Sequence, residues 1–267
     1  MPRSIQSNNF EKEKLPKNAP VTSEYARTIK CHRVEAYEPI NWLILGCRDF
    51  FAMPIISGFY GLCFMAAAVA IVLLIQWQGT HLVIMPALII FMLIGPFLAL
   101  GLYDASWACE KGHQPSLLHS MRAIGRNSVS QWAFAVLLAV AMMFWMRIGA
   151  LLHALYPSVT GAPWQDFLPF LLIGSAVGIV LATIVFAISA FSIPLMMERR
   201  VDMMTAVFTS VNAVRSNLLA MALWAAIIGL GVLIGFATFG VGMLITIPIL
   251  GYGTWHAYRN VISRRHH

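Results

Sequence analysis

Charged side chains are scarce in this chain, and carboxylates are the scarcest. Only 11% of the 267 residues are Asp, Glu, Lys or Arg, with 11 acidic residues against 18 basic ones. A soluble domain carries about 25% charged residues. Because 59% of the residues are hydrophobic, a water-soluble fold of this length could not bury them all. We conclude that the surrounding solvent is lipid.

Alternation of polar and apolar residues is also missing. A membrane β-barrel needs alternating stretches of roughly ten residues, whereas runs such as FMAAAVAIVLLI do not alternate. A spanning helix needs roughly 20 mostly apolar residues. Six segments meet this requirement: 54–76, 82–103, 129–152, 168–194, 218–236 and 238–257. The predicted fold class is therefore all-α, a polytopic membrane protein with about six transmembrane helices.

Cysteines and catalytic signatures are few or absent. None of the four cysteines is predicted on the outer face, so we expect no structural disulfide. No GxSxG, HExxH, Walker or Rossmann pattern occurs in a suitable strand-to-helix context. The basic residues do not form an aromatic-interleaved patch for nucleic acid. We expect no enzymatic activity, no cofactor, no metal and no nucleic-acid partner.

The basic residues that are present predict the topology. Seventeen of the eighteen Lys and Arg residues fall in the N-terminal tail, the 2–3 and 4–5 connections or the C-terminal tail. These segments share one side of a six-span topology, and that side is expected to be the cytoplasm. We therefore predict a multi-pass protein of the bacterial inner membrane with both termini cytoplasmic. The net charge of +7 is read as a topology signal.

A small-residue pattern occurs twice, ahead of the third and fifth predicted spans. SMRAIGRN at 120–127 and SVNAVRSN at 210–217 share one frame. At 100° per residue the shared positions form one narrow stripe on a helix. Small residues allow close helix packing in membranes, so we predict two short amphipathic helices packed through this stripe. The predicted packing residues are Ser120, Ala123, Asn127, Ser210, Ala213 and Asn217.

The even-numbered predicted spans also resemble one another. Each has a Pro near its end, namely Pro96, Pro194 or Pro248, and a polar residue eight positions later. These polar residues are Asp104, Asp202 and His256. We predict two or three repeated units, each an interfacial amphipathic helix followed by a helical hairpin. The units cover about 40–107, 115–197 and 202–260, within a transmembrane domain at 40–262 that follows a disordered cytoplasmic tail at 1–39 and precedes a C-terminal tail at 263–267.

Three stretches carry a resemblance to a known family. They are WLILGCRDFFAMPIISGFYGLCF, PLMMERRVDMMTAVFTSVNAVRSN and GYGTWHAYRNVI. In these motifs the chain resembles the bacterial predicted integral membrane proteins of domain of unknown function 2189, over roughly residues 40–262. Related sequences often have Trp where Cys47 stands. The resemblance implies a membrane protein and no particular chemistry.

Histidines and cysteines leave two weaker alternatives open. Cys109 and His113 are four residues apart, a spacing that can place two metal ligands on one helix face, although Gly112 interrupts the helix. His81 and His153 could both face outward and ligate a haem. A solvated loop and interfacial histidines are the more common explanations.

The few charges near the predicted spans are candidate functional residues. Arg147 is the one charge inside a span, so it is either a functional charge or a side chain that reaches the outer headgroups, with Asp166 as its expected partner. Asp104, Glu198 and Asp202 lie at inner span ends. They form either a proton or cation site, or caps and pairs with Arg199, Arg200 and Arg122.

These observations favour a non-catalytic inner-membrane protein. We expect an accessory, assembly or scaffold subunit of a larger membrane complex, a respiratory complex being one example, with the lipid bilayer and other membrane subunits as partners. The alternative is a small-solute or lipid transporter, which would need a polar cavity near the membrane midplane. A haem-bearing electron-transfer protein is the weaker alternative.

Overall fold

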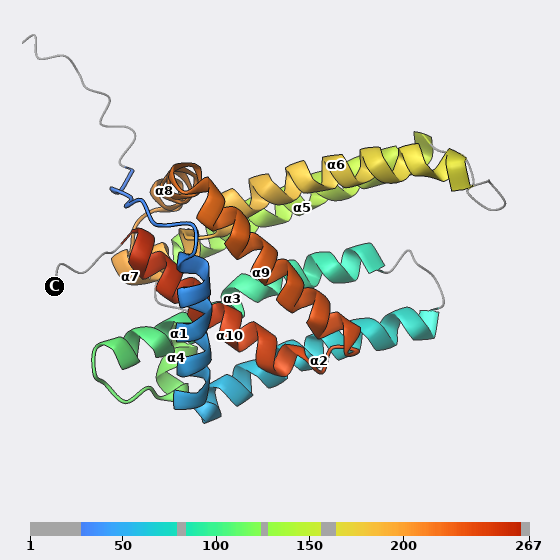
Figure 1. Cartoon of the computed structure of the whole chain (residues 1–267). Helices are drawn as coiled ribbons and strands as arrows, with labels where there is room; N and C mark the ends of the chain where they lie inside the picture. The colour runs from blue at the N-terminus through green and yellow to red at the C-terminus, as the bar shows by residue number, and fades with distance from the viewer. Residues whose placement is uncertain (1–27, 79–83, 124–127, 156–163, 263–267) are drawn as a thin grey trace, which may run out of the picture.

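The computed structural model describes residues 28–78, 84–123, 128–155 and 164–262, and these residues are helical apart from their connections. Long apolar stretches form helices because a helix satisfies its own backbone hydrogen bonds. Figure 1 shows long helices running from a compact end where the short helices gather. The helices are α1 (Glu38–Ala52), α2 (Pro54–Gln78), α3 (Ile84–Glu110), α4 (Leu117–Ala123), α5 (Ser128–Leu155), α6 (Trp164–Ser189), α7 (Ser192–Arg199), α8 (Met203–Ser216), α9 (Leu218–Ala237) and α10 (Met243–Val261).

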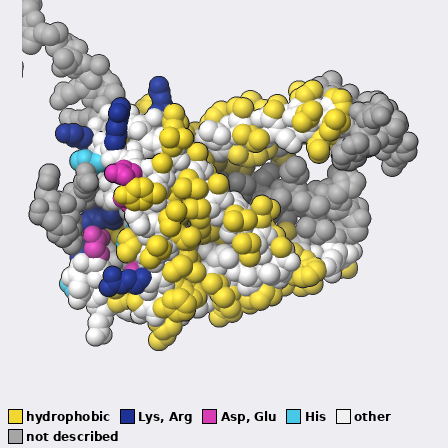
Figure 2. Space-filling model, viewed as in Figure 1, with side chains coloured by type: hydrophobic (Ala, Val, Ile, Leu, Met, Phe, Trp, Pro, Cys, Tyr) yellow, Lys and Arg dark blue, Asp and Glu magenta, His cyan; other side chains and the backbone are white. Residues whose placement is uncertain are grey.

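Four segments are long and apolar enough to cross a membrane among the residues described. They are Pro54–Leu74, Val129–Leu152, Leu168–Arg199 and Leu218–Ala237. Figure 2 shows hydrophobic side chains over the long helices and charged ones at the compact end. The chain is thus an all-helical, multi-pass integral membrane protein. Four of the six predicted spans coincide with these segments.

The fourth predicted span, 168–194, is broken before its end. α6 stops at Ser189, and α7 begins at Ser192 with Pro194 in its first turn. A continuous helix would need an N–H at residue 194 to bond the Ala190 carbonyl, and proline has none. At this break, the Ser192 hydroxyl donates to the Ile188 carbonyl over 2.5 Å. Pro194 therefore separates a long apolar helix from a short buried one.

The sixth predicted span, 238–257, begins five residues too early. Residues 238–242 form the turn between α9 and α10. Phe239, at φ 54°, and Gly240, at φ 91°, are left-handed. Their N–H groups bond the carbonyls of Phe236 and Gly235 over 2.9 and 3.0 Å. This is a Schellman ending of α9, made by apolar residues that hydropathy cannot distinguish from a span.

Helix α10 lies at the centre of the bundle, between α1, α2, α3 and α9. Pro248 is buried inside it, and Pro96 lies inside α3. The fully buried rings of Trp42, Trp224 and Trp255 fill the core around it. Trp42 and Trp224 meet edge to face, with centroids 5.7 Å apart. α10 thus unites the first and last parts of the chain in one core.

An extended strap, residues 28–37, crosses α8 and the end of α10. The Ile29 N–H donates to Thr209 Oγ1 over 3.2 Å, and the Val34 N–H donates to Asn217 Oδ1 over 2.8 Å. The His32 N–H donates to the Val261 carbonyl over 2.7 Å. We predicted a disordered tail through residue 39, but the strap is fixed by these bonds. The first and the last residues that the structure describes therefore lie side by side, beside the end of α10.

Candidate functional site

The charged side chains of the compact end are paired across helices that are distant in the sequence. Arg259 of α10 donates from Nη1 to Glu198 Oε1 over 2.6 Å and from Nη2 to Glu110 Oε1 over 2.9 Å. Its Nε also donates to Glu110 Oε1 over 3.1 Å. The Tyr258 hydroxyl donates to Glu198. One guanidinium therefore joins the ends of α3, α7 and α10.

A second polar group joins α1, α3 and α10. His256 Nε2 lies 2.9 Å from Asp49 Oδ2, and the Ser106 hydroxyl donates to the same oxygen over 2.5 Å. Asp49 is 14% exposed. A half-buried carboxylate with two such partners is satisfied within the fold. The bonds among Asp49, Ser106 and His256 therefore stabilise the contact between α1 and α10.

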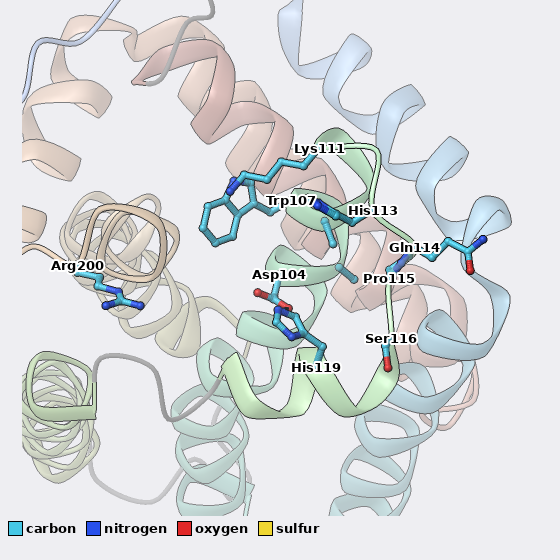
Figure 3. A pocket seen from close by; sticks show the side chains of 11 residues that line it. Asp104, Trp107, Lys111, His113, Gln114, Pro115, Ser116, His119 and Arg200 are labelled. Atoms are coloured by element: carbon cyan, nitrogen blue, oxygen red, sulfur yellow. Dashed lines mark ion pairs between the residues drawn. The ribbon is translucent and has the colours of Figure 1, made fainter.

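A cleft of about 580 Å³ lies beside these pairs. Its walls come from the end of α3, the 111–116 connection, α4 and the residue that follows α7. Figure 3 shows Asp104 and His119 facing each other in it, with Arg200 on the opposite side. His119 Nε2 lies 3.6 Å from the carboxylate of Asp104, which is only 2% exposed. The cleft therefore has a deep carboxylate and cationic walls.

The end of α3 shapes one wall of the cleft. Gly112 has φ 73°, its N–H bonds the Cys109 carbonyl, and the His113 N–H bonds the Ala108 carbonyl, both over 3.0 Å. This Schellman ending needs a residue that tolerates φ > 0. Just before this turn, Lys111 follows Trp107 by four residues, and its Nζ lies 3.7 Å from the Trp107 ring centroid in a cation–π contact.

The acidic residues predicted at inner span ends do not converge on one site. Glu198 pairs with Arg259, and Asp104 with His119. Asp202 caps α8 by accepting from the Thr205 N–H and hydroxyl over 3.0 and 2.7 Å. The Thr205 hydroxyl and then its amide lower the pKa of Asp202. Within the described residues, these three carboxylates thus cap α8 or pair with Arg259 and His119.

The remaining predicted residues are placed as follows. Arg147 is exposed on α5, and within the described part of the chain it makes no ion pair. His81 and the side chains of Asp166 and His153 lie outside the described residues. Among the residues described, no three His, Cys, Asp or Glu side chains could hold a metal ion together.

The two small-residue stripes lie at the compact end. Ser120, Ala123, Ser210 and Ala213 are at most 1% exposed, while Asn127 lies outside the described residues. Ser120 shares a 3.1 Å hydrogen bond with the Tyr60 hydroxyl. Ser210 donates to the Ala187 carbonyl over 2.8 Å and accepts from the Phe191 N–H. These contacts tie α4 to α2 and α8 to the α6–α7 break.

Asn217 has more partners than the sequence suggested. Besides accepting from Val34, its Nδ2 donates to the carbonyls of His32 and Ala213 over 3.0 and 3.1 Å. A buried amide with three such bonds fixes the strap at the α8–α9 junction.

Sequence reasoning missed the residues that connect the helices here. Asp49, Glu110, Ser106 and Arg259 were not singled out. In α10, Arg259 follows His256 by three residues and Trp255 by four, which places its side chain beside both on the helix surface. That spacing was the available signal.

Comparison with known proteins agrees with this picture of an apolar helical fold. A family model described as predicted integral membrane protein, DUF2189, matches residues 83–198. Over this segment, the chain is similar to the DUF2189 family. The matched segment runs from the start of α3 to the end of α7, so it includes the cleft-forming end of α3 and the α5–α6 hairpin. No curated protein and no solved structure matches the chain.

Proposed function

We propose that this protein is a non-catalytic accessory, assembly or scaffold subunit of a larger membrane complex. The observation that carries the proposal is the poor burial of the α5–α6 hairpin. In the most apolar stretch of Leu168–Arg199, no residue is buried within the chain. In that of Val129–Leu152, 11% of the residues are buried. The corresponding figure for Pro54–Leu74 is 39%.

The hairpin is attached to the rest of the molecule mainly at the compact end. Outside the pair, α5 and α6 contact chiefly α3, α7 and α8, and Figure 1 shows them extending along one side. Lipid can cover such a surface. Helices in membranes are nevertheless stabilised by packing against other helices. Away from the compact end, this hairpin packs little against the rest of its own chain.

Helix α6 also has the small-residue spacing that membrane helices use to associate. Gly174 and Gly178 are four residues apart, and a Cβ added to either would meet nothing within 4 Å. A glycine pair of this spacing permits close approach of a second helix. The open space supports a partner helix from another membrane subunit.

The proposal includes six membrane crossings, with α3 and α10 added to the four apolar segments, and both termini on the cytoplasmic side of a bacterial inner membrane. The adjacency of the strap and the α10 end favours an even number of crossings. Basic residues near both ends, such as Arg33 and Arg259, support the cytoplasmic assignment. The short helices α1, α4 and α8, each preceding a long one, support three repeated units.

The test is capture of the complex with matched glycine variants. The tagged protein is extracted in mild detergent, and co-purifying chains are identified for the wild type, Gly178→Ile and Gly229→Ile. Gly229 is on α9, and a Cβ added to it would also meet nothing within 4 Å. We expect Gly178→Ile to lose a membrane partner that Gly229→Ile retains, with both variants melting as the wild type does.

A photo-crosslinking amino acid in place of Ile179 distinguishes a surface covered by a protein partner from one covered by lipid. Ile179 is 66% exposed on α6. A protein adduct to a different membrane protein supports the proposal. Adducts to lipid alone, or to a second copy of this chain alone, contradict it.

A further inference from the structure

The cleft at the compact end is lined by two cationic side chains that pair with no carboxylate among the described residues. Lys111 comes from the connection after α3, and Arg200 from the residue after α7. Among the described residues neither side chain makes an ion pair. The histidines His113 and His119 are exposed at the rim. Among the described residues that line the cleft, Asp104 is the one acidic side chain, and it faces His119.

Arg200 occupies its position at a conformational cost. Its φ of 52° lies in the left-handed region, where it ends α7. Glycine is the usual residue at such a helix end, because a side chain is disfavoured there. A strained residue with a functional group facing a cleft points to a role for that group.

We propose that this cleft binds a phosphate group through Lys111 and Arg200. Guanidinium and ammonium groups form short, charge-assisted hydrogen bonds to phosphate oxygens, and Arg can do so with two parallel bonds. Lys111 and Arg200 line the same cleft from two different parts of the chain, and two such cations suit an anion. The volume of about 580 Å³ exceeds that of a bare phosphate and leaves room for the group that carries it.

The surroundings favour the phosphate of an anionic membrane lipid. α4 contributes His119 to the cleft, and its neighbours Leu118 and Met121 are 60% and 45% exposed. Apolar side chains of a short helix beside a basic surface are typical of a helix at the boundary of headgroups and acyl chains. The headgroup would lie in the cleft and the acyl chains along the apolar side of α4.

The test titrates the full-length protein in detergent with short-chain phosphatidylglycerol, phosphatidylcholine or glycerol phosphate, with native mass spectrometry as readout. We expect phosphatidylglycerol to bind best. Lys111→Gln and Arg200→Gln should each weaken its binding about tenfold, as loss of a charge-assisted contact predicts. Arg215→Gln, which removes an exposed charge on α8 away from the cleft, should leave binding within about twofold of wild type.

A second variant separates binding from folding. Arg200→Gly removes the guanidinium but also relieves the left-handed strain, so it should melt no lower than the wild type while still binding about tenfold more weakly. Equal losses in Arg215→Gln and the cleft variants would overturn the site. Glycerol phosphate binding as tightly as the lipid would overturn the lipid assignment, and equal binding of phosphatidylcholine would overturn the preference for an anionic headgroup.

Discussion

Two glycines allow the central helix to approach its neighbours closely. A Cβ on Gly46 of α1 would lie 2.9 Å from the Gly253 nitrogen of α10, and one on Gly61 of α2 would lie 3.0 Å from the Leu244 carbonyl carbon. Both neighbours are backbone atoms, which cannot move aside as a flexible side chain can. The positions of α1 and α2 against α10 therefore depend on the missing side chains.

The first prediction compares two glycines of the same helix. Gly61→Ala should lower the free energy of unfolding by about 1–3 kcal/mol, because the methyl group collides with the α10 backbone. In Gly58→Ala the added Cβ meets nothing within 4 Å, so it should be neutral or stabilise α2 by up to about 1 kcal/mol. Melting temperature in detergent measures both. Equal melting of the two variants would contradict this account of the α2–α10 contact.

At the scale of the helix, α4 and α8 place small residues inward and larger ones outward. Ala123 and Ala213 are fully buried, whereas Arg122 and Asn212 are exposed. Each Ala adjoins its exposed neighbour in the sequence, so the four positions form two matched pairs.

The second prediction uses these pairs. Leu at Ala123 or Ala213 should overpack the buried side and cost about 1–3 kcal/mol in stability. Leu at Arg122 or Asn212 should cost much less, because those side chains face outward. The detergent melting temperatures of the four single variants give the comparison. A larger loss at Arg122 or Asn212 would mean that the buried stripe has no packing role.

The elements differ in how far the sequence determines them. α2, α5, α6 and α9 are predictable, since their hydropathy dominates any local signal. α10 was misplaced because its preceding turn is as apolar as a span, and α7 because Pro194 divides a continuous apolar run. The charged cluster was not predictable: Asp49 and His256 are 207 residues apart, and Glu110 and Arg259 are 149 apart. No local pattern records such pairings.

For the whole molecule, the asymmetry of charge gives a prediction about topology. A reporter active only outside the cytoplasm should be silent when fused after His267, because the end of α10 shares the basic end of the molecule with the strap. Fused near Thr80 or Val159, the reporter should be active. A periplasmic C-terminus would contradict the six-crossing arrangement.

The strap has a consequence for the order of events during synthesis. Val34 emerges from the ribosome early, but its partner Asn217 follows 183 residues later. At about 5–20 residues per second, the strap waits on the order of 10–40 s for that partner. It can close over α8 only after nearly the entire chain has been made. Closure of the strap is thus a late step, and it marks a molecule whose last two long helices are in place.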